Sequence, residues 1–572
     1  MAQVATPTKT FDVDKLRATA EKAAERFKVP GVQVVVIQDR EVRFAGGFGL
    51  RDVAQGQPIT EHTVFAHGST GKSYTALLIG TLVDDGLLTW DSKVRDLVPD
   101  FRLSDPIVTA QVSVRDILSH RWGLPRHEFV HLAYPGADRA EMVRRLRDLQ
   151  LSKELRELFQ YSNFGYLLAG HIIGVLTNST WEEQLRKRVL EPLGMKDTTI
   201  GTSEIDSIAD RSIAYDDKDG EPVAIPYRSM ANMNPAGGLF SSAADVTRYL
   251  LCQLNGGEVD GTRVISEASL KETHNLQMPL GAFPSLQGLP LRAYGYGMGW
   301  MLGTYRGKHL VEHGGGIDGF TTEFALLPED GMAVAVCGNH ASALPNALTY
   351  QVFDQLLGID DTDWPGIVGE QMEKMEAAFK EGQAPKKTVE NAPPAHPLAD
   401  YAGNYEHPGY GTLDVKADGD QLAVTLGSLA FNNTHRHFET WDLVFPDLGE
   451  IKFELTFVTD GSGDVSAAEV NFETALPAIR FPRGADASAS DEEALGKLAG
   501  SYTLGPITLE IKVEAGPKLV AYQNGTRVDL APAGKRKFNV PVMPGLTLEF
   551  VVDDEGRATQ IATPQGTLTR AD

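Results

Sequence analysis

The sequence predicts an α/β protein of the α+β kind, in which an antiparallel sheet with flanking helices and an inserted helical region precedes two small antiparallel β domains. Apolar, strand-like runs stand at both ends of residues 11–360, and helical segments lie between them. This order favours one sheet that is built from both ends of the segment. Beyond it the residues alternate between apolar and polar, with glycine-containing turns, and part of the pattern occurs twice. Such alternation is typical of β structure.

The length and charge of the chain limit the classes of protein to which it can belong. Its 572 residues exceed what one hydrophobic core usually organises, so we expect more than one domain. The 77 acidic residues outnumber the 53 basic ones and give a formal charge of −24. Such a charge disfavours nucleic acid and anionic membranes as partners. No apolar run reaches the ~20 residues of a membrane-spanning helix. We therefore expect a small-molecule or peptide substrate.

The N-terminus and the cysteines favour a cytoplasmic protein. The first residues lack the basic stretch and following apolar stretch of a secretory signal. Cys252 and Cys337 lie in apolar surroundings and do not indicate a disulfide framework. His120, His127 and His131 lie close together in sequence, but no carboxylate spacing matches a metal site. We therefore expect neither a metal nor another cofactor.

The spacing of apolar residues predicts the elements of the first domain. A helical region is expected to stop at Glu191-Pro-Leu-Gly-Met195, and Pro328-Glu-Asp-Gly331 is typical of a hairpin turn. The expected order is helix 11–27, strands 31–38 and 41–47, helix 72–86, helical region 163–190, and strands 321–327 and 332–337.

The C-terminal part of the chain predicts two tandem β domains. Residues 381–397 are rich in Lys, Glu, Ala and Pro, which is typical of a linker. The run LADYAGNY at 398–405 aligns with LGKLAGSY at 495–502, an offset of 97 residues. Two copies are too few for a solenoid, and closing each sheet into a barrel would remove its exposed edges. We therefore expect domains at residues 1–380, 398–485 and 486–572, with the linker 381–397 after the first.

The first element of a candidate active site is His67-Gly-Ser69-Thr-Gly-Lys72, which leads into the helical run. Residues three apart share one face of a helix, so the amine of Lys72 would lie beside the hydroxyl of Ser69. A serine hydroxyl is a weak acid and needs a base, and a buried lysine with a lowered pKa can be one. Alone, this spacing is more typical of a helix N-cap followed by a surface lysine.

The second element is Tyr161-Ser-Asn163. A phenol near cationic groups can lose its proton and act as a base, or it can relay a proton to a leaving group. The amide of Asn163 could hold Lys72 and a substrate carbonyl at once. Alone, the tripeptide is more typical of a helix N-cap with a packed tyrosine.

The third element is His313-Gly314-Gly315-Gly316, which comes shortly before a predicted strand. Glycines beside a sheet edge let a substrate backbone approach closely. A backbone N–H of this run, paired with that of Ser69, could form an oxyanion hole. Alone, the run is more typical of a glycine-rich loop with an incidental histidine. The three elements together, in this order, predict a serine hydrolase.

These residues resemble the motifs of the serine β-lactamase and penicillin-binding-protein superfamily, specifically of its class C-like branch. Ser69 and Lys72 match its Ser-x-x-Lys element. Tyr161 and Asn163 match its Tyr-x-Asn element, and the run from His313 stands where Lys-Thr-Gly is usual. Three further segments resemble framework segments of this branch and extend the likeness over residues 11–360, namely 118–124, 191–195 and 234–242.

The resemblance implies a penicillin-recognising domain that works through an acyl-enzyme. Ser69 would be the nucleophile, and Lys72 and Tyr161 would share its proton. Tyr161, assisted by His313, would protonate the leaving group. The N–H groups of Ser69 and Gly316 would form the oxyanion hole. Substrate contacts are expected from Asn163, Gly314 and Gly315, and from Trp122 if it lines the pocket.

The histidine at position 313 favours one part of this superfamily. In β-lactamases and carboxypeptidases a lysine there helps to bind the substrate carboxylate, whereas a histidine is a weaker cation. His313 resembles the D-aminopeptidase and esterase members, and D-aminopeptidases also carry two C-terminal, lipocalin-like β barrels. We expect a D-aminopeptidase-like hydrolase of small peptides or amino acid derivatives. A carboxylesterase, an acyltransferase or peptide-cyclising thioesterase and a weakly active penicillin-binding sensor stay open, as does a homodimer.

Overall fold

The computed structural model describes residues 11–218, 220–281, 289–359, 362–382, 388–446, 451–461, 463–484, 491–514, 516, 518–534, 536–543 and 545–571. The chain forms two compact units, Met1–Ala384 and Pro385–Asp572. The predicted linker 381–397 and the predicted border between residues 485 and 486 both include positions outside the described residues. The predicted domain bounds therefore stay a prediction.

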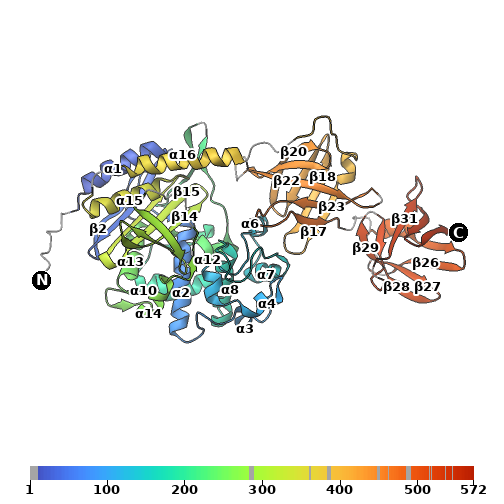
Figure 1. The fold of residues 1–572 in the computed structure, drawn as a ribbon, viewed down its shortest axis with the longest axis horizontal. Coiled ribbons are helices and arrows are strands. Elements are labelled where there is room, and N and C mark those ends of the chain that lie inside the picture. The colour runs from blue at the N-terminus through green and yellow to red at the C-terminus, as the bar shows by residue number, and fades with distance from the viewer. Residues whose placement is uncertain are drawn as a thin grey trace. The chain divides into compact units, whose positions relative to one another are not determined.

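The first unit is built on a nine-stranded antiparallel sheet (Figure 1). Strand β1 (Gly31–Gln38) lies between β2 (Glu41–Asp52) and β16 (Met332–Gly338), so strands from both ends of the unit are neighbours. This arrangement confirms the predicted fold class, although β2 continues past its predicted end at residue 47. The remaining strands of the sheet are β3 (Gln57–Pro58), β11 (Met278–Pro279), β12 (Leu291–Tyr296), β13 (Met301–Tyr305), β14 (Lys308–Ile317) and β15 (Phe320–Leu327).

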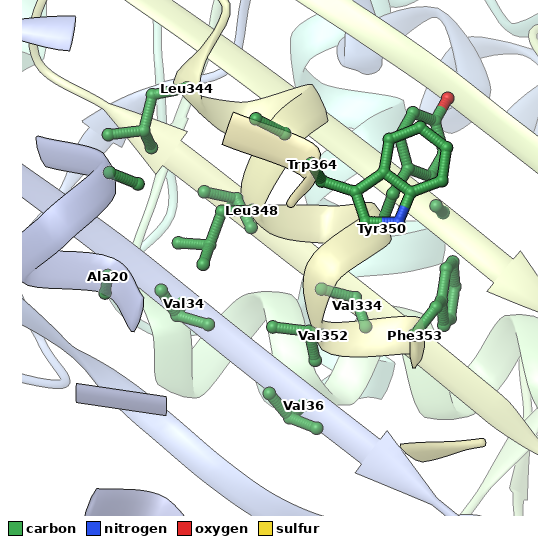
Figure 2. Packing of buried hydrophobic residues seen from close by; sticks show 14 of the residues in the cluster. Ala20, Val34, Val36, Val334, Leu344, Leu348, Tyr350, Val352, Phe353 and Trp364 are labelled. Atoms are coloured by element: carbon green, nitrogen blue, oxygen red, sulfur yellow. The ribbon is translucent and has the colours of Figure 1, made fainter. Parts of the chain in front are cut away.

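One face of the sheet is covered by α1 (Val13–Phe27), α15 (Leu344–Leu356) and α16 (Trp364–Gly382), with a hydrophobic core between helices and sheet. All of β1 is buried, and because successive side chains of a strand point to opposite faces, Val34 and Val36 both enter this core. Figure 2 shows them facing the side chains of α15. Burial of one such valine contributes roughly 1.5–3 kcal/mol, so this layer fixes the sheet firmly.

The region between β3 and β11 is mainly helical, as predicted. The expected helical region 163–190 is broken, because α8 (Asn163–Thr177) ends at Asn178 in a left-handed conformation, with φ +48°. A new helix, α9 (Trp181–Leu185), then begins behind Thr180, which accepts a hydrogen bond from Glu183. The other helices of this region are α2 (Gly71–Asp84), α3 (Val94–Leu97), α4 (Pro106–Gln111), α5 (Val114–Leu118), α6 (Glu128–Ala133), α7 (Arg139–Arg145), α10 (Glu191–Leu193), α11 (Thr202–Ile205), α12 (Asn234–Gly237), α13 (Ala243–Leu254) and α14 (Glu267–Thr273).

Short strands between the helices of this region form three small sheets. One sheet has the order β4 (Phe65–Ala66), β8 (Leu239–Ser241) and β5 (Thr199–Ile200), and it fixes the backbone just before Ser69. The other two are the hairpins β6 (Ala214–Lys218) with β7 (Glu221–Ile225), and β9 (Glu258–Val259) with β10 (Thr262–Arg263).

The second unit contains two antiparallel, nearly closed, barrel-like sheets, as predicted. In the first sheet, neighbouring strands follow one another in sequence order. An isolated β-bridge between Tyr405 and Arg483 connects the two ends of this sheet. In the second, β25 pairs with both β26 and β33. The strands of the first sheet are β17 (Gly403–His407), β18 (Gly411–Asp418), β19 (Gln421–Leu426), β20 (Leu429–His437), β21 (Thr440–Val444), β22 (Lys452–Thr459), β23 (Val465–Val470) and β24 (Ile479–Pro482). Those of the second are β25 (Gly500–Leu504), β26 (Ile507–Glu514), β27 (Lys518–Gln523), β28 (Thr526–Asp529), β29 (Ala531–Gly534), β30 (Lys537–Asn539), β31 (Thr547–Val552), β32 (Ala558–Thr563) and β33 (Gly566–Arg570).

The repeated sequence forms the same hydrogen bond between a helix and the first strand in both barrels. Each barrel follows a short helix, α17 (Leu398–Tyr401) or α18 (Glu492–Leu498). The hydroxyl of Tyr405 donates to the carbonyl four residues earlier, at 2.7 Å, and the hydroxyl of Tyr502 does the same at 2.7 Å. The aligned tyrosines therefore anchor the first strand of each barrel to the helix before it.

Candidate active site

Ser69 lies in a tight turn, the 3-10 helix η1 (Gly68–Thr70), directly before α2. The turn requires a glycine at position 68, because φ there is +54° and an added Cβ would lie 2.8 Å from the backbone nitrogen of Gly316. The Thr70 hydroxyl donates to the His67 carbonyl at 3.0 Å. Ser69 itself is only partly buried, so a substrate can approach its hydroxyl.

Lys72 lies one helical turn further and is fully buried, with 0% exposure. Its Nζ donates to Ser69 Oγ at 3.0 Å, to Asn163 Oδ1 at 2.8 Å and to the Ala236 carbonyl at 2.8 Å. Burial lowers the pKa of Lys72 to about 7. A large fraction of this amine is therefore neutral at physiological pH and can accept a proton.

Tyr161 stands just before α8, and its phenol is close enough to Ser69 for the serine hydroxyl to lower the pKa of the phenol. Lys72 Nζ lies 4.8 Å from the centre of the Tyr161 ring, and the ring of His120 lies 4.4 Å from it, centre to centre. Burial raises the pKa of Tyr161 above its usual range, and the nearby Ser69 hydroxyl offsets only part of this effect. The raised pKa favours the protonated phenol at neutral pH, a form that can donate a proton.

Strand β14 passes close to the nucleophile turn because it carries glycines. A Cβ on Gly315 would lie 2.1 Å from the His67 carbonyl oxygen and 3.1 Å from the backbone nitrogen of Ser69. The Thr322 hydroxyl, on the neighbouring strand β15, donates to the same His67 carbonyl at 2.8 Å. These contacts bring the backbone of Gly315 and Gly316 beside that of Ser69, as an oxyanion hole requires.

Gly315→Ala is expected to lower kcat/KM by at least about 10²-fold, which is the usual cost of losing one oxyanion donor. The new methyl group would meet the His67 carbonyl, which cannot move without moving Ser69. Gly316→Ala is the matched comparison and is expected to lose far less, because nothing lies within 4 Å of its added Cβ. Hydrolysis of a nitrophenyl ester by the two variants measures this difference. Equal losses in both would contradict the predicted role of the close approach.

His313 is buried beside the nucleophile, with 4% exposure, and both of its ring nitrogens are engaged. Nδ1 donates to the Gly314 carbonyl at 2.6 Å, which leaves Nε2 to accept from the Tyr296 hydroxyl at 3.0 Å. Burial, with a smaller effect of Lys72, lowers the pKa of His313 to about 3. The ring is therefore neutral, and it lies 6.2 Å from the ring of Tyr161, centre to centre.

The structure brings together most of the residues that the sequence predicts for the site. Lys72 donates hydrogen bonds to Ser69 and Asn163, the ring of Tyr161 lies beside Lys72, and Gly314 and Gly316 are exposed on the adjoining strand. Trp122 is different, because its side chain is fully buried. Its predicted contact with substrate therefore stays a prediction. Such a contact would require neighbouring residues to move and expose the Trp122 ring.

Glu128 is a site residue that the sequence did not indicate. Its Oε1 accepts from Asn163 Nδ2 and from His131 Nε2, both at 3.1 Å, and its Oε2 accepts from Arg126 Nε at 3.0 Å. Burial opposes its charge, but the hydrogen bond from His131 and the nearby Arg126 lower the pKa of Glu128 to about 2. Glu128 thus orients the amide that holds Lys72. No motif spacing pointed to it, because Asn163, the partner that links it to the site, is 35 residues away in sequence.

Arg126 and Glu128 act on the charge of Lys72 in opposite directions. The carboxylate of Glu128 raises the pKa of Lys72, and the guanidinium of Arg126 lowers it. Arg126 lies with its guanidinium carbon 5.4 Å from the centre of the Tyr161 ring, and its side chain is 55% exposed. The pair therefore adjusts the pKa of Lys72, on which burial has the largest effect.

Arg126→Gln and Glu128→Gln are expected to move the acidic limb of the pH–rate profile in opposite directions. Loss of the cation raises the pKa of Lys72 and moves the limb to higher pH, whereas loss of the carboxylate moves it to lower pH, each by roughly 0.5–1 pH unit. The measurement is kcat/KM against pH at constant ionic strength. Arg263→Gln is a matched control, because Arg263 pairs with Glu258 at 2.6 Å and is 51% exposed. Shifts of the same sign in both variants would contradict the expectation.

Two further findings concern metals and membranes. Among the described residues no group of three or more His, Cys, Asp or Glu side chains is placed to hold a metal ion. Likewise, no helix within the described ranges is long and apolar enough to cross a membrane.

Comparison with known proteins gives the family of the chain. Residues 16–356 match the family model described as Beta-lactamase, and residues 387–482 match a domain of unknown function, DUF3471. The chain is 30% identical over 482 residues to the Unguisins hydrolase ungD of Aspergillus violaceofuscus, an alignment that covers 78% of this chain and 83% of that protein. The structure of the octameric penicillin-binding protein homologue from Pyrococcus abyssi matches with a TM-score of 0.55 and 26% identity, over 81% of this chain and 98% of that one.

A third likeness concerns the fold alone. The D-amino acid amidase from Ochrobactrum anthropi SV3, in its complex with L-phenylalanine, matches with a TM-score of 0.51 and 24% identity, over 65% of this chain and all (100%) of that one. The family model covers more than half of the chain, including Ser69, Lys72, Tyr161 and His313. The chain therefore belongs to the β-lactamase and penicillin-binding-protein superfamily, a family of serine hydrolases.

Proposed function

We propose that the protein is a serine hydrolase that cleaves amide or ester bonds of small peptides or amino acid derivatives through an acyl-enzyme on Ser69. One observation carries the proposal. The amine of Lys72 lies 3.0 Å from Ser69 Oγ, and burial lowers its pKa to about 7. A neutral amine at this distance can take the hydroxyl proton as the oxygen attacks, which is what an activated serine needs.

The acylation step begins with this proton transfer. Ser69 Oγ passes its proton to Lys72 Nζ and forms a bond to the substrate carbonyl carbon. The carbonyl oxygen becomes an oxyanion, held by the N–H groups of Ser69 and Gly316. Donors that are already in place before the reaction cost no reorganisation as the charge develops, so they lower the barrier.

Collapse of the tetrahedral intermediate needs an acid. Burial keeps the Tyr161 phenol protonated, and the phenol is close to Ser69, so it lies near the bond that breaks. It donates its proton to the leaving amine or alcohol as the carbon–heteroatom bond breaks, and the ammonium of Lys72 returns a proton to the phenolate. The two residues thus act in sequence, with Lys72 as the base and Tyr161 as the donor.

Water completes the cycle in the hydrolytic form of the reaction. It attacks the acyl-enzyme, loses a proton to Lys72, and releases the acid product as Ser69 Oγ regains its proton. His313 has no direct part in these transfers, since its two ring nitrogens bond to Gly314 and Tyr296. We propose that it holds β14 and Tyr296 in place beside the nucleophile.

The finer proposal is a D-aminopeptidase-like specificity. A neutral imidazole at position 313 offers no fixed charge to a substrate carboxylate, unlike the lysine usual in β-lactamases. The relative from A. violaceofuscus is a hydrolase by name, which supports hydrolysis rather than binding alone. The same geometry would serve a carboxylesterase, so amide and ester substrates must be compared directly.

A substrate panel tests this proposal. It contains D- and L-amino acid nitroanilides, short-chain nitrophenyl esters and nitrocefin, each with and without an added amine and each against Ser69→Ala. Preferential cleavage of the D-nitroanilides is expected. Cleavage of esters alone would indicate a carboxylesterase, and an amide product with the added amine would indicate an acyltransferase. Labelling of Ser69 by a fluorophosphonate without turnover of any substrate would indicate a sensor and contradict the hydrolase proposal.

Assembly and location are proposals as well. The similar protein from P. abyssi is octameric, which supports self-association of this chain, as the predicted homodimer or a larger assembly. Cys252 and Cys337 are both free and buried, and this supports the proposed cytoplasmic location.

A further inference from the structure

Two acidic side chains lie directly behind the strand that borders the active site. On β14, His313 faces the nucleophile, and because neighbouring side chains of a strand alternate, Glu312 and Gly314 face the other way. Gly314 pairs with Glu323 of β15, so Glu323 faces that same side. A Cβ on Gly314 would lie 3.1 Å from Glu323 Oε2, so this carboxyl group supports the glycine from behind.

The two carboxyl groups are bound by neutral donors from one helix. The Tyr350 hydroxyl donates to Glu312 Oε2 at 2.9 Å, and Asn346 Nδ2 donates to Glu323 Oε2 at 2.6 Å. Both donors lie on α15, four residues apart, and therefore share one face of the helix. Glu323 is only 2% exposed, and Glu312 is partly buried. The structure shows neither glutamate in an ion pair with any residue that it describes.

The charged groups nearby are engaged elsewhere. Tyr305 packs on Tyr350 with ring centres 5.4 Å apart, and its hydroxyl bonds to Asp354. Arg306, an arginine of the same layer, donates to both carboxylate oxygens of Asp354. Glu312 and Glu323 are therefore faced by Tyr350, Asn346 and each other, and no cation among the described residues pairs with either carboxyl group.

Burial of this kind favours the protonated carboxyl. It raises the pKa of Glu312 to about 7, and it raises the pKa of Glu323 well above its usual range, with the charge of Glu312 adding to the effect. Two neighbouring carboxylates, one fully and one partly buried, cannot both ionise at low cost without a paired cation, and such a pair loses its protons in two separate steps. We therefore expect one proton to stay on the pair at neutral pH.

We propose that Glu312 and Glu323 are positioning residues that hold β14 in its working place at the active site only while one proton remains on the pair. Loss of that proton leaves two neighbouring negative charges between β14 and α15, and the strand relieves their repulsion by moving away from α15. Gly315 and Gly316 would then shift relative to Ser69, which would dissolve the oxyanion hole. The pair thus ends the activity at alkaline pH.

This loss of activity, the alkaline limb of the pH–rate profile, does not come from the groups that activate the nucleophile. Lys72 is already neutral above its pKa of about 7, and Tyr161 keeps its proton because burial raises its pKa. Neither group therefore accounts for a loss of rate at high pH. The inference rests on the proposed hydrolase function for its activity readout, but its stability readout does not depend on that function.

The test compares wild type, Glu323→Gln and Glu312→Gln between pH 6 and 10.5. Each variant replaces an acid by a neutral amide of the same shape and removes one of the two titrations. Glu329→Gln is the matched control, because Glu329 is exposed in the turn just after β15. The readouts are kcat/KM for a nitrophenyl ester and the thermal midpoint at each pH.

In wild type, kcat/KM is expected to fall about tenfold per pH unit beyond the second ionisation of the pair. In Glu323→Gln this limb is expected to move up by at least about one pH unit or to disappear, with rates within about threefold of wild type at pH 6. A group whose folded pKa is raised loses its stabilising effect as pH rises through that pKa. The thermal midpoint of Glu323→Gln, minus that of wild type, should therefore become more positive as pH increases.

The outcomes separate the possible failures. Wild-type profiles of rate and stability in both variants would overturn the inference. A changed stability profile with an unchanged alkaline limb would show that the pair is structural only, and would also overturn it. If no substrate is turned over by any form of the protein, the hydrolase proposal fails, whereas the thermal midpoints still test the shared proton.

Discussion

Ser69→Ala is expected to lower kcat/KM by at least about 10⁴-fold, since removing a serine nucleophile abolishes acylation and leaves only binding and oxyanion stabilisation. The fold should survive, because Ser69 is partly exposed and Lys72 keeps its bonds to Asn163 and to the Ala236 carbonyl. The measurement is hydrolysis of the best substrate of the panel, together with the thermal midpoint.

Ser162→Ala serves as the control for this variant. Ser162 is fully buried close to the site, and its hydroxyl has no hydrogen-bond partner among the described residues. It makes the same chemical change without touching the nucleophile, and we expect a rate within about threefold of wild type, as for a residue outside the machinery. Turnover of an activated ester by Ser69→Ala at the wild-type rate would refute the assignment of the nucleophile.

Lys72→Arg is expected to lower kcat/KM by about 10³-fold or more, within the range that general acid–base catalysis contributes. Arginine keeps the positive charge and the hydrogen bonding, but it stays protonated at every accessible pH and cannot accept the serine proton. Lys72→Ala should lose as much. A conservative change that is as damaging as truncation distinguishes a base from a group that only supplies charge.

The pH dependence of wild type follows from the same reasoning. The base must be neutral to accept a proton, so kcat/KM is expected to fall about tenfold per pH unit below pH 7 and to level off above it, until the alkaline decrease that we assign to Glu312 and Glu323 begins. Retention by Lys72→Arg of more than a tenth of the wild-type rate, or an acidic limb near pH 4–5, would show that a carboxylate rather than Lys72 is the base.

The sequence could predict the residues whose proximity is local. Ser69 and Lys72 are three positions apart at the start of a helix, and helix geometry alone brings the amine to the hydroxyl. Tyr161 and His313 are distant in sequence, so their meeting at the site depends on the fold. Only the order of three motifs together indicated that the fold would join them.

The sequence could not predict the groups that tune the site. Glu128 acts through Asn163, His131 and Arg126, and no spacing marks it as different from a surface glutamate. In the sequence, Glu323 is one polar residue in an apolar strand. Its position beside the active-site strand is known only from the strand register, which pairs it with Gly314. Long-range register is set by packing of the whole sheet, which a local pattern does not contain.

Helix boundaries show the same limit. The expected helical region 163–190 has apolar periodicity throughout, yet Asn178 adopts a left-handed conformation that ends α8. Asparagine tolerates this conformation better than most residues, and the capping box at Thr180 then starts a new helix. Asn178 and the capping box are both visible in the sequence, but the apolar periodicity of residues 163–190 predicted a continuous helical region. The β repeat was more informative, because its aligned tyrosines carry out the same hydrogen bond in both barrels.

The rate at which a fluorophosphonate labels the intact protein, followed by mass spectrometry as pH is varied, tests the pairing of a serine with a neutral lysine most directly. The account predicts one adduct, on the peptide that contains Ser69, formed at a rate that rises through pH 7 and is lost in Lys72→Arg. An adduct on another residue, or a rate at Ser69 that does not change between pH 5 and 9, would contradict it.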